Sequence, residues 1–216
     1  EGKLGKIYHW RGCYLQSWLM DPEFTLTWHL QKEIAGSGAS GGINSHSVDL
    51  ARFLVGEIKS VTAMAKTFVE ERPISEGTAG GTFASGESTG NMGKVTVEDA
   101  ISMVAEFENG ALGSFEATTF AIGRENYNYF EIYGSKGAVI FNLERMNELQ
   151  YYSGEDGEGE KGFRTILATQ ASHPYISAWW PPAHNIGYEH EFHHAVYDFL
   201  NAIDSGESIA PNFYDG

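Results

Sequence analysis

The strongest constraint on the fold is a run of two-residue alternation in the middle of the chain. Apolar side chains recur at every second position, at Ile101, Met103, Ala105 and Phe107. The pair Asn109-Gly110 follows directly and is a strong signal for a two-residue hairpin turn. The return strand of this hairpin is predicted at residues 112–120. A second hairpin is predicted from residues 127–133 and 138–142, and a further strand at residues 148–152. Because strands joined by short turns pair antiparallel, this section predicts the centre of an antiparallel sheet.

Helical periodicity is confined to two segments. Apolar residues recur at helical spacing within residues 45–55 and again within residues 188–203. Gly56 and Gly206 stand where these helices should stop. The first helix lies before the alternating section and the second lies after it, so no repeated strand–helix–strand series is indicated.

The remaining regular segments are two strands and one long loop. The strands are predicted at residues 6–19 and 58–69, and the loop at residues 75–93, where Gly, Ser and Thr dominate. Six or seven mostly antiparallel strands with two helices define an α+β fold. We therefore predict one domain over residues 1–216, with a large open sheet and helices packed on one of its faces.

Charge excludes two classes of partner. The chain has 14 basic and 29 acidic residues, a formal net charge of -15, so it should repel nucleic acid and anionic membranes.

No apolar run approaches the ~18 residues of a spanning helix, and residues 1–6 carry no signal-peptide pattern. Cys13 is the only cysteine, which predicts no disulfide and fits a cytoplasmic protein.

One short motif matches a nucleotide-binding pattern. The run from Gly36 to Gly41 fits G-x-G-x-x-G and precedes a helix. A dinucleotide site would require a buried parallel strand before it, whereas residues 27–35 contain several polar and charged side chains. We interpret the run as a loop that lets the backbone approach a ligand or a neighbouring strand.

A second motif matches a zinc-protease pattern. The run from His190 to His194 fits H-E-x-x-H. Rotation by about 100° per residue places both histidines on the side of the helix opposite its apolar stripe. A catalytic metal needs supporting residues behind its ligands, so we predict no metal site and a pair of solvent-facing or interface-facing histidines.

Three other segments, in their order along the chain, carry a resemblance. They are Tyr14-Leu15-Gln16-Ser17-Trp18 with Trp28, the run from Gly36 through the helix at residues 45–56, and Trp180-Pro181-Pro182 with His184 and the following helix. Together they resemble the second domain of the Gfo/Idh/MocA oxidoreductases, the relatives of glucose–fructose oxidoreductase and inositol dehydrogenase. The resemblance covers essentially the whole chain.

The resemblance implies the substrate-binding and oligomerisation domain of an NAD- or NADP-dependent enzyme that oxidises the CH–OH group of a sugar or polyol. The Rossmann domain of that family has no counterpart here, so we expect the chain to be truncated at both ends. It should bind no cofactor by itself and be inactive alone. The resemblance also implies a homo-oligomer formed through the open sheet.

The same resemblance assigns the site. His46 matches the catalytic histidine of the family, and an imidazole suits a base for a hydroxyl proton because its pKa lies near neutral. The predicted sugar-binding residues combine aromatic faces with hydrogen-bonding groups. They are Tyr14, Gln16, Trp18, Trp28, His29, Trp180 and His184.

Several positions depart from the family pattern. Relatives commonly carry aspartate four residues before the histidine, where this chain has Gly42. Asn44, Ser17 and His29 stand where glycine, aspartate and arginine are usual. Loss of the carboxylate would remove the group that orients the base. Two functions therefore stay open: an oxidoreductase domain with weakened or redirected chemistry, and a non-catalytic dimerisation or interaction module derived from the family.

Overall fold

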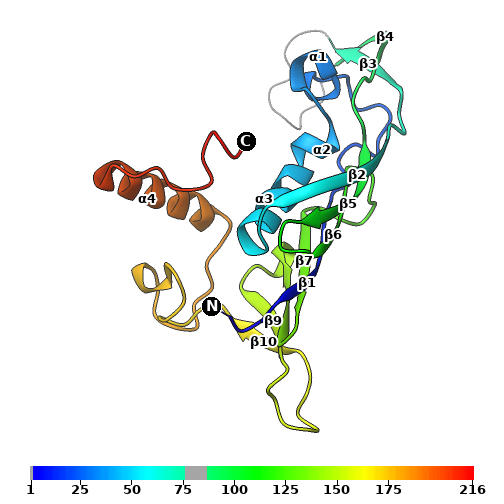
Figure 1. The fold of residues 1–216 in the computed structure, drawn as a ribbon. Coiled ribbons are helices and arrows are strands. Elements are labelled where there is room, and N and C mark those ends of the chain that lie inside the picture. Colours follow the sequence, from blue (N-terminus) through cyan, green and yellow to red (C-terminus); the bar gives the residue numbers. More distant parts are fainter. Residues whose placement is uncertain (1, 76–86) are drawn as a thin grey trace.

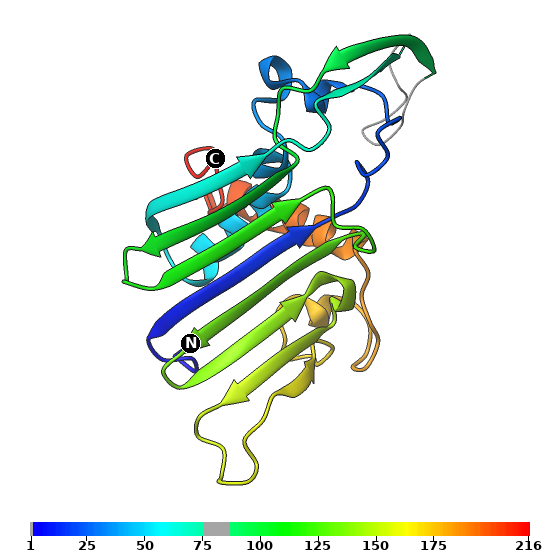
Figure 2. The ribbon, with the colours of Figure 1, turned by 90° about the vertical axis from the view of Figure 1, so that its right-hand side faces the viewer.

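The centre of the fold is an eight-stranded sheet, seen edge-on in Figure 1 and face-on in Figure 2. The computed structural model describes residues 2–75 and 87–216. The strand order is β10-β9-β8-β7-β1-β6-β5-β2. The strands are β1 (Ile7–Leu15), β2 (Ile58–Lys66), β5 (Ala100–Phe107), β6 (Leu112–Thr118), β7 (Tyr127–Gly134), β8 (Gly137–Asn142), β9 (Glu148–Ser153) and β10 (Arg164–Leu167).

The predicted hairpins form this sheet, and the predicted α+β class is confirmed. β5 pairs with β6, and β7 with β8, both antiparallel. The exception to antiparallel order is β1, which lies between the two hairpins and runs parallel to β6 while pairing antiparallel with β7. The strand nearest the N-terminus therefore joins two sections that the chain makes much later.

One face of the sheet carries the core and helix α3 (Asn44–Leu54). α3 lies across this face, with Ala51 fully buried against the strands. Trp10 of β1 stacks on Phe130 of β7, with ring centroids 5.0 Å apart, and Phe115 of β6 lies on its other side. Both α3 and α4 (Glu189–Ser205) lie on this side of the sheet, and the opposite face is open (Figure 1).

The prediction of a loop over residues 75–93 is wrong at both ends of this range. β3 (Glu71–Ser75) and β4 (Ser88–Lys94) pair into a separate two-stranded sheet. β4 has little apolar alternation and is held by backbone pairing, which a search for apolar periodicity does not detect. Residues 76–86 of the predicted loop lie outside the described residues. The other short helical elements are α1 (Lys32–Ala35), α2 (Ala39–Gly42), η1 (Trp28–Leu30), η2 (Leu143–Arg145) and η3 (Ile176–Ala178).

Helix α4 forms where it was predicted, but its apolar stripe is not part of the core. Its large apolar side chains are 57–63% exposed, at Phe192, Val196, Phe199, Leu200 and Ile203. The helix stands away from the sheet (Figure 1). Periodicity shows that a helix has an apolar side, but it does not show which surface covers that side. Within residues 2–75 and 87–216, no helix is both long and apolar enough to cross a membrane.

Candidate functional site

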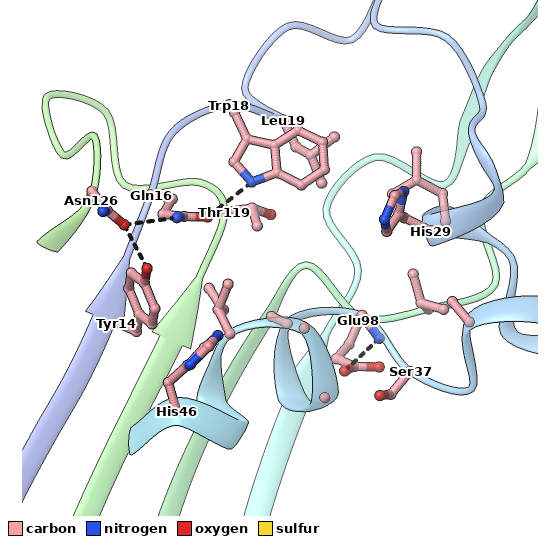
Figure 3. Close-up of a pocket in the computed structure, with 18 of the residues that line it drawn as sticks. Tyr14, Gln16, Trp18, Leu19, His29, Ser37, His46, Glu98, Thr119 and Asn126 are labelled. Atoms are coloured by element: carbon pink, nitrogen blue, oxygen red, sulfur yellow. Dashed lines mark hydrogen bonds between the residues drawn. The ribbon is translucent and has the colours of Figure 1, made fainter. Parts of the chain in front are cut away.

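A cavity of about 730 Å³ lies where the C-terminal end of β1 meets the N-terminus of α3 (Figure 3). Six of the eight predicted site residues line it: Tyr14, Gln16, Trp18, Trp28, His29 and His46. Trp180 and His184 do not. Trp180 is exposed, and the Nδ1 atom of His184 lies 2.9 Å from the carbonyl of Pro181 in its own loop. Their order in the sequence could not show which way this loop turns.

The wall of the cavity beside β1 is a chain of hydrogen bonds. Trp18 Nε1–H donates to Gln16 Oε1 at 3.1 Å, and Gln16 Nε2 donates to Asn126 Oδ1 at 3.3 Å. The hydroxyl of Tyr14 donates to the same Asn126 oxygen at 2.5 Å. Asn126 was not predicted, and no signal in the sequence indicates it, because it lies 112 residues after Tyr14 and follows no motif.

The direction of this hydrogen-bond chain is set at Trp18. An indole N–H can only donate, so Gln16 must turn its oxygen toward Trp18 and its amide nitrogen toward Asn126. Asn126 then presents its oxygen, and Tyr14 must donate to it. Burial raises the pKa of Tyr14, so its hydroxyl keeps its proton at neutral pH. The Tyr14 oxygen is left with lone pairs and can accept a hydrogen bond from a ligand hydroxyl.

His46 lies in the first turn of α3, with its exposed imidazole beside the cavity. Its ring meets Tyr14 edge-to-face, with centroids 5.6 Å apart. Four residues earlier, Gly42 also lines the cavity, and a Cβ atom built there would meet nothing within 4 Å. An aspartate side chain at this position would therefore have room in the cavity.

Glu98 organises the glycine-rich turn before α3. Its Oε1 atom accepts from the backbone N–H groups of Gly38 and Ser40, each at 2.9 Å, and from the Ser40 hydroxyl. Burial acts to raise the pKa of Glu98, but the hydrogen bonds from Ser40 and Gly38 outweigh burial and lower it. The N–H groups that a pyrophosphate would need are bonded to this carboxylate. The turn approaches a neighbouring segment of the chain through these bonds.

The histidines of the H-E-x-x-H run do not gather as metal ligands. His190 Nδ1 accepts from the backbone of Gly187 at 3.0 Å, and His194 Nε2 accepts from Trp179 Nε1–H at 2.7 Å. No group of three potential metal ligands occurs among the described residues. The expectation of solvent-facing or interface-facing histidines needs correction, because these side chains hold the 170–187 segment against α4. Tyr175 adds a stack on His194.

The bond between Trp179 and His194 should depend on pH. Burial, followed by the nearby His190, lowers the pKa of His194, while Asp198 acts to raise it. A histidine with a lowered pKa in the folded state stabilises that state fully above about pH 6.5, and the contribution is lost as the pH falls. We expect the indole N–H signal of Trp179 in ¹H–¹⁵N NMR spectra to shift between pH 7.5 and pH 5. His194→Gln should remove the pH dependence, and an unchanged signal in the native chain would contradict the prediction.

The fold defines a class of protein domain, in which an open, mostly antiparallel sheet carries a helix across one face and a cavity at the end of its first strand. Residues 1–140 match the domain family described as the GFO/IDH/MocA C-terminal domain. The chain belongs to this family.

Comparison with individual proteins gives the same result. The chain is 46% identical over 219 residues to levoglucosan dehydrogenase of Pseudarthrobacter phenanthrenivorans, a match that covers the whole chain and 55% of the relative. An oxidoreductase domain protein from Kribbella flavida is 47% identical with a TM-score of 0.90, over 99% of this chain and 55% of that one. Levoglucosan dehydrogenase in complex with NADH and levoglucosan is 43% identical with a TM-score of 0.88, over 99% and 54%. The chain thus spans about half the length of these relatives.

Proposed function

We propose that this chain is the substrate-binding domain of an NAD(P)-dependent oxidoreductase that acts on the CH–OH group of a sugar or polyol, with His46 as the base. The observation that carries the proposal is the position of His46 beside a cavity walled by tyrosine, tryptophan and amide groups. In support, relatives are named levoglucosan dehydrogenase, and their structures hold NADH with levoglucosan or L-sorbose.

The residues of the cavity suit a neutral, polyhydroxylated ligand. The Tyr14 oxygen accepts from a ligand hydroxyl, and the amide nitrogen of Asn126 donates to another. The rings of Trp18 and Trp28 supply the apolar faces on which sugar C–H groups pack. His46 then accepts the proton of the hydroxyl on the carbon that is oxidised.

Oxidation also needs a hydride acceptor, which NAD or NADP supplies in this class of enzyme. The described residues do not fit such a cofactor, because the glycine-rich turn is already bonded to Glu98. We therefore propose that the 216-residue chain binds the sugar but does not oxidise it. A change in nicotinamide absorbance with this chain alone would contradict that part of the proposal.

Calorimetry with levoglucosan and L-sorbose tests the binding function. We expect saturable binding of at least one of the two sugars by the native chain. Tyr14→Phe should weaken it roughly fivefold, because one hydrogen-bonding group contributes about 1 kcal/mol. Tyr152→Phe, on β9, is the matched control and should bind like the native chain. Absence of binding by the native chain, or equal weakening in both variants, would overturn the proposal.

The alternative function is an interaction module, and the open face of the sheet favours a second copy of the chain as its partner. Val104 and Leu112 on this face are about half exposed, at 52% and 48%. Arg11 lies beside Glu131 in the register of β1 and β7, so the face mixes apolar side chains with both charges. Sedimentation should then give twice the 23.8 kDa of one chain, and Val104→Glu should give single chains. Single chains of the native protein at all concentrations would contradict a homo-oligomer.

A further inference from the structure

Arg72 on β3 is a fully buried charge, with 0% of its surface exposed. Its guanidinium is bonded to backbone carbonyls of one neighbouring loop. Nη2 donates to the carbonyl of Leu19 at 2.7 Å, and Nη1 donates to the carbonyls of Asp21 at 2.7 Å and Phe24 at 3.3 Å. A planar guanidinium with donors in fixed directions can reach all of these carbonyls at once, which an ammonium group cannot.

Burial of the Arg72 guanidinium costs folding free energy, because the charge loses its contact with water. No carboxylate lies within ion-pair distance of Arg72 among the described residues, and its Nε–H has no hydrogen-bond partner there. Burial lowers the pKa of Arg72, against the opposing charges of Asp99 and Asp21. Buried charges without an ion-pair partner usually destabilise a fold. We therefore look for the role of Arg72 in the loop that carries Leu19, Asp21 and Phe24.

The loop bonded to Arg72 carries part of the cavity wall. Leu19, whose carbonyl accepts from Nη2, lines the cavity, and so does the neighbouring Trp18. The ring of Phe24 lies 5.9 Å from the guanidinium on one side and meets Trp18 edge-to-face at 5.5 Å on the other. The contacts thus run from Arg72 through Phe24 to Trp18, whose indole N–H sets the direction of the bonds to Gln16 and Asn126.

We infer that Arg72 is a positioning residue for sugar recognition: by fixing the carbonyls of Leu19, Asp21 and Phe24 it aims the Trp18 indole at Gln16 and so sets which cavity groups donate and which accept. This inference rests on the proposed function for its effect on sugar affinity. Its effect on the Trp18 geometry does not depend on any ligand.

The experiment compares Arg72→Met with the native 216-residue chain by two readouts. In ¹H–¹⁵N NMR spectra, the indole N–H signal of Trp18 should shift or broaden. The signal of Trp10, which is buried in the core of the sheet, should stay in place. In calorimetry, the affinity for levoglucosan or L-sorbose should fall at least tenfold. Arg145→Met is the matched control, since it removes the same charge from an exposed pair with Glu148, and both readouts should be unchanged.

Arg72→Lys keeps the experiment decisive if Arg72→Met does not fold. Lysine retains the positive charge but lacks the planar set of donors that bonds the three carbonyls. We therefore expect a folded chain with a displaced Trp18 signal and a smaller loss of affinity than in Arg72→Met. An unmoved Trp18 signal in a folded Arg72→Lys or Arg72→Met chain would overturn the inference. If the native chain binds neither sugar, the proposed function fails, and the Trp18 signal still decides the role of Arg72.

Discussion

Turnover is expected to rise on the order of a hundredfold when Gly42 is replaced by aspartate in a version of the protein that also carries a nucleotide-binding half. Position 42 lies four residues before His46 and lines the same cavity, and a Cβ atom there meets nothing within 4 Å. A carboxylate at this position would orient the imidazole and stabilise its protonated form while the base holds the hydroxyl proton.

A chimera with the N-terminal half of levoglucosan dehydrogenase provides the measurement. The rate of NAD reduction with levoglucosan is compared for the native sequence, Gly42→Asp and Gly42→Asn. Asparagine has the size of aspartate but no charge, so it separates the carboxylate from simple filling of space. If asparagine raises the rate as much as aspartate does, or if neither raises it, the orienting role of the missing carboxylate is wrong.

The second large effect is expected from Gly38→Ala. A Cβ atom at Gly38 would lie 2.0 Å from the carbonyl oxygen of Glu98 and 3.0 Å from Val97 Cγ2. The backbone of the turn would have to move away from Glu98, which breaks its bonds to Gly38 and Ser40. We expect a loss of about 2–3 kcal/mol in the free energy of unfolding, as for other overpacked sites. Roughly 5–10 °C in Tm follows for a chain of this size.

Gly42→Ala is the matched control in the same turn, because nothing surrounds that Cβ position. Position 42 is helical, so alanine should leave the unfolding free energy unchanged or raise it by up to about 1 kcal/mol. Thermal unfolding followed by circular dichroism measures both variants. Equal Tm values for the two would show that close approach at Gly38 does not determine the shape of the turn.

The strands of the sheet could be predicted where pairing partners are close in the sequence and joined by a recognisable turn. The hairpin at Asn109-Gly110 follows from alternation and turn chemistry within about twenty residues, and β5, β6, β7 and β8 all form near the predicted positions. The insertion of β1 between β6 and β7 could not be predicted, since its partners lie about a hundred residues away. The exposed side of α4 was missed because periodicity does not show which surface covers an apolar stripe. The pairing of β3 with β4 is local, but it was missed because β4 has little apolar alternation.

The candidate site divides in a similar way. His46, Tyr14 and Trp18, which line the cavity, could be predicted because they lie within short motifs that carry the family resemblance. Asn126, Glu98 and Arg72 were missed, because each acts on residues 48 to 112 positions away and none belongs to a motif. Their roles depend on hydrogen bonds that exist only in the folded chain.

The central place of β1 has a consequence for biosynthesis. Residues 7–15 leave the ribosome about a hundred residues before their pairing partners, so both edges of this strand remain unpaired until β6 and β7, ending at residue 134, have been made. Long-range pairing of this kind slows folding. The sheet cannot close before residue 134 has been translated, and during that interval a strand containing Trp10 and Tyr14 is open to chaperones and to other nascent chains.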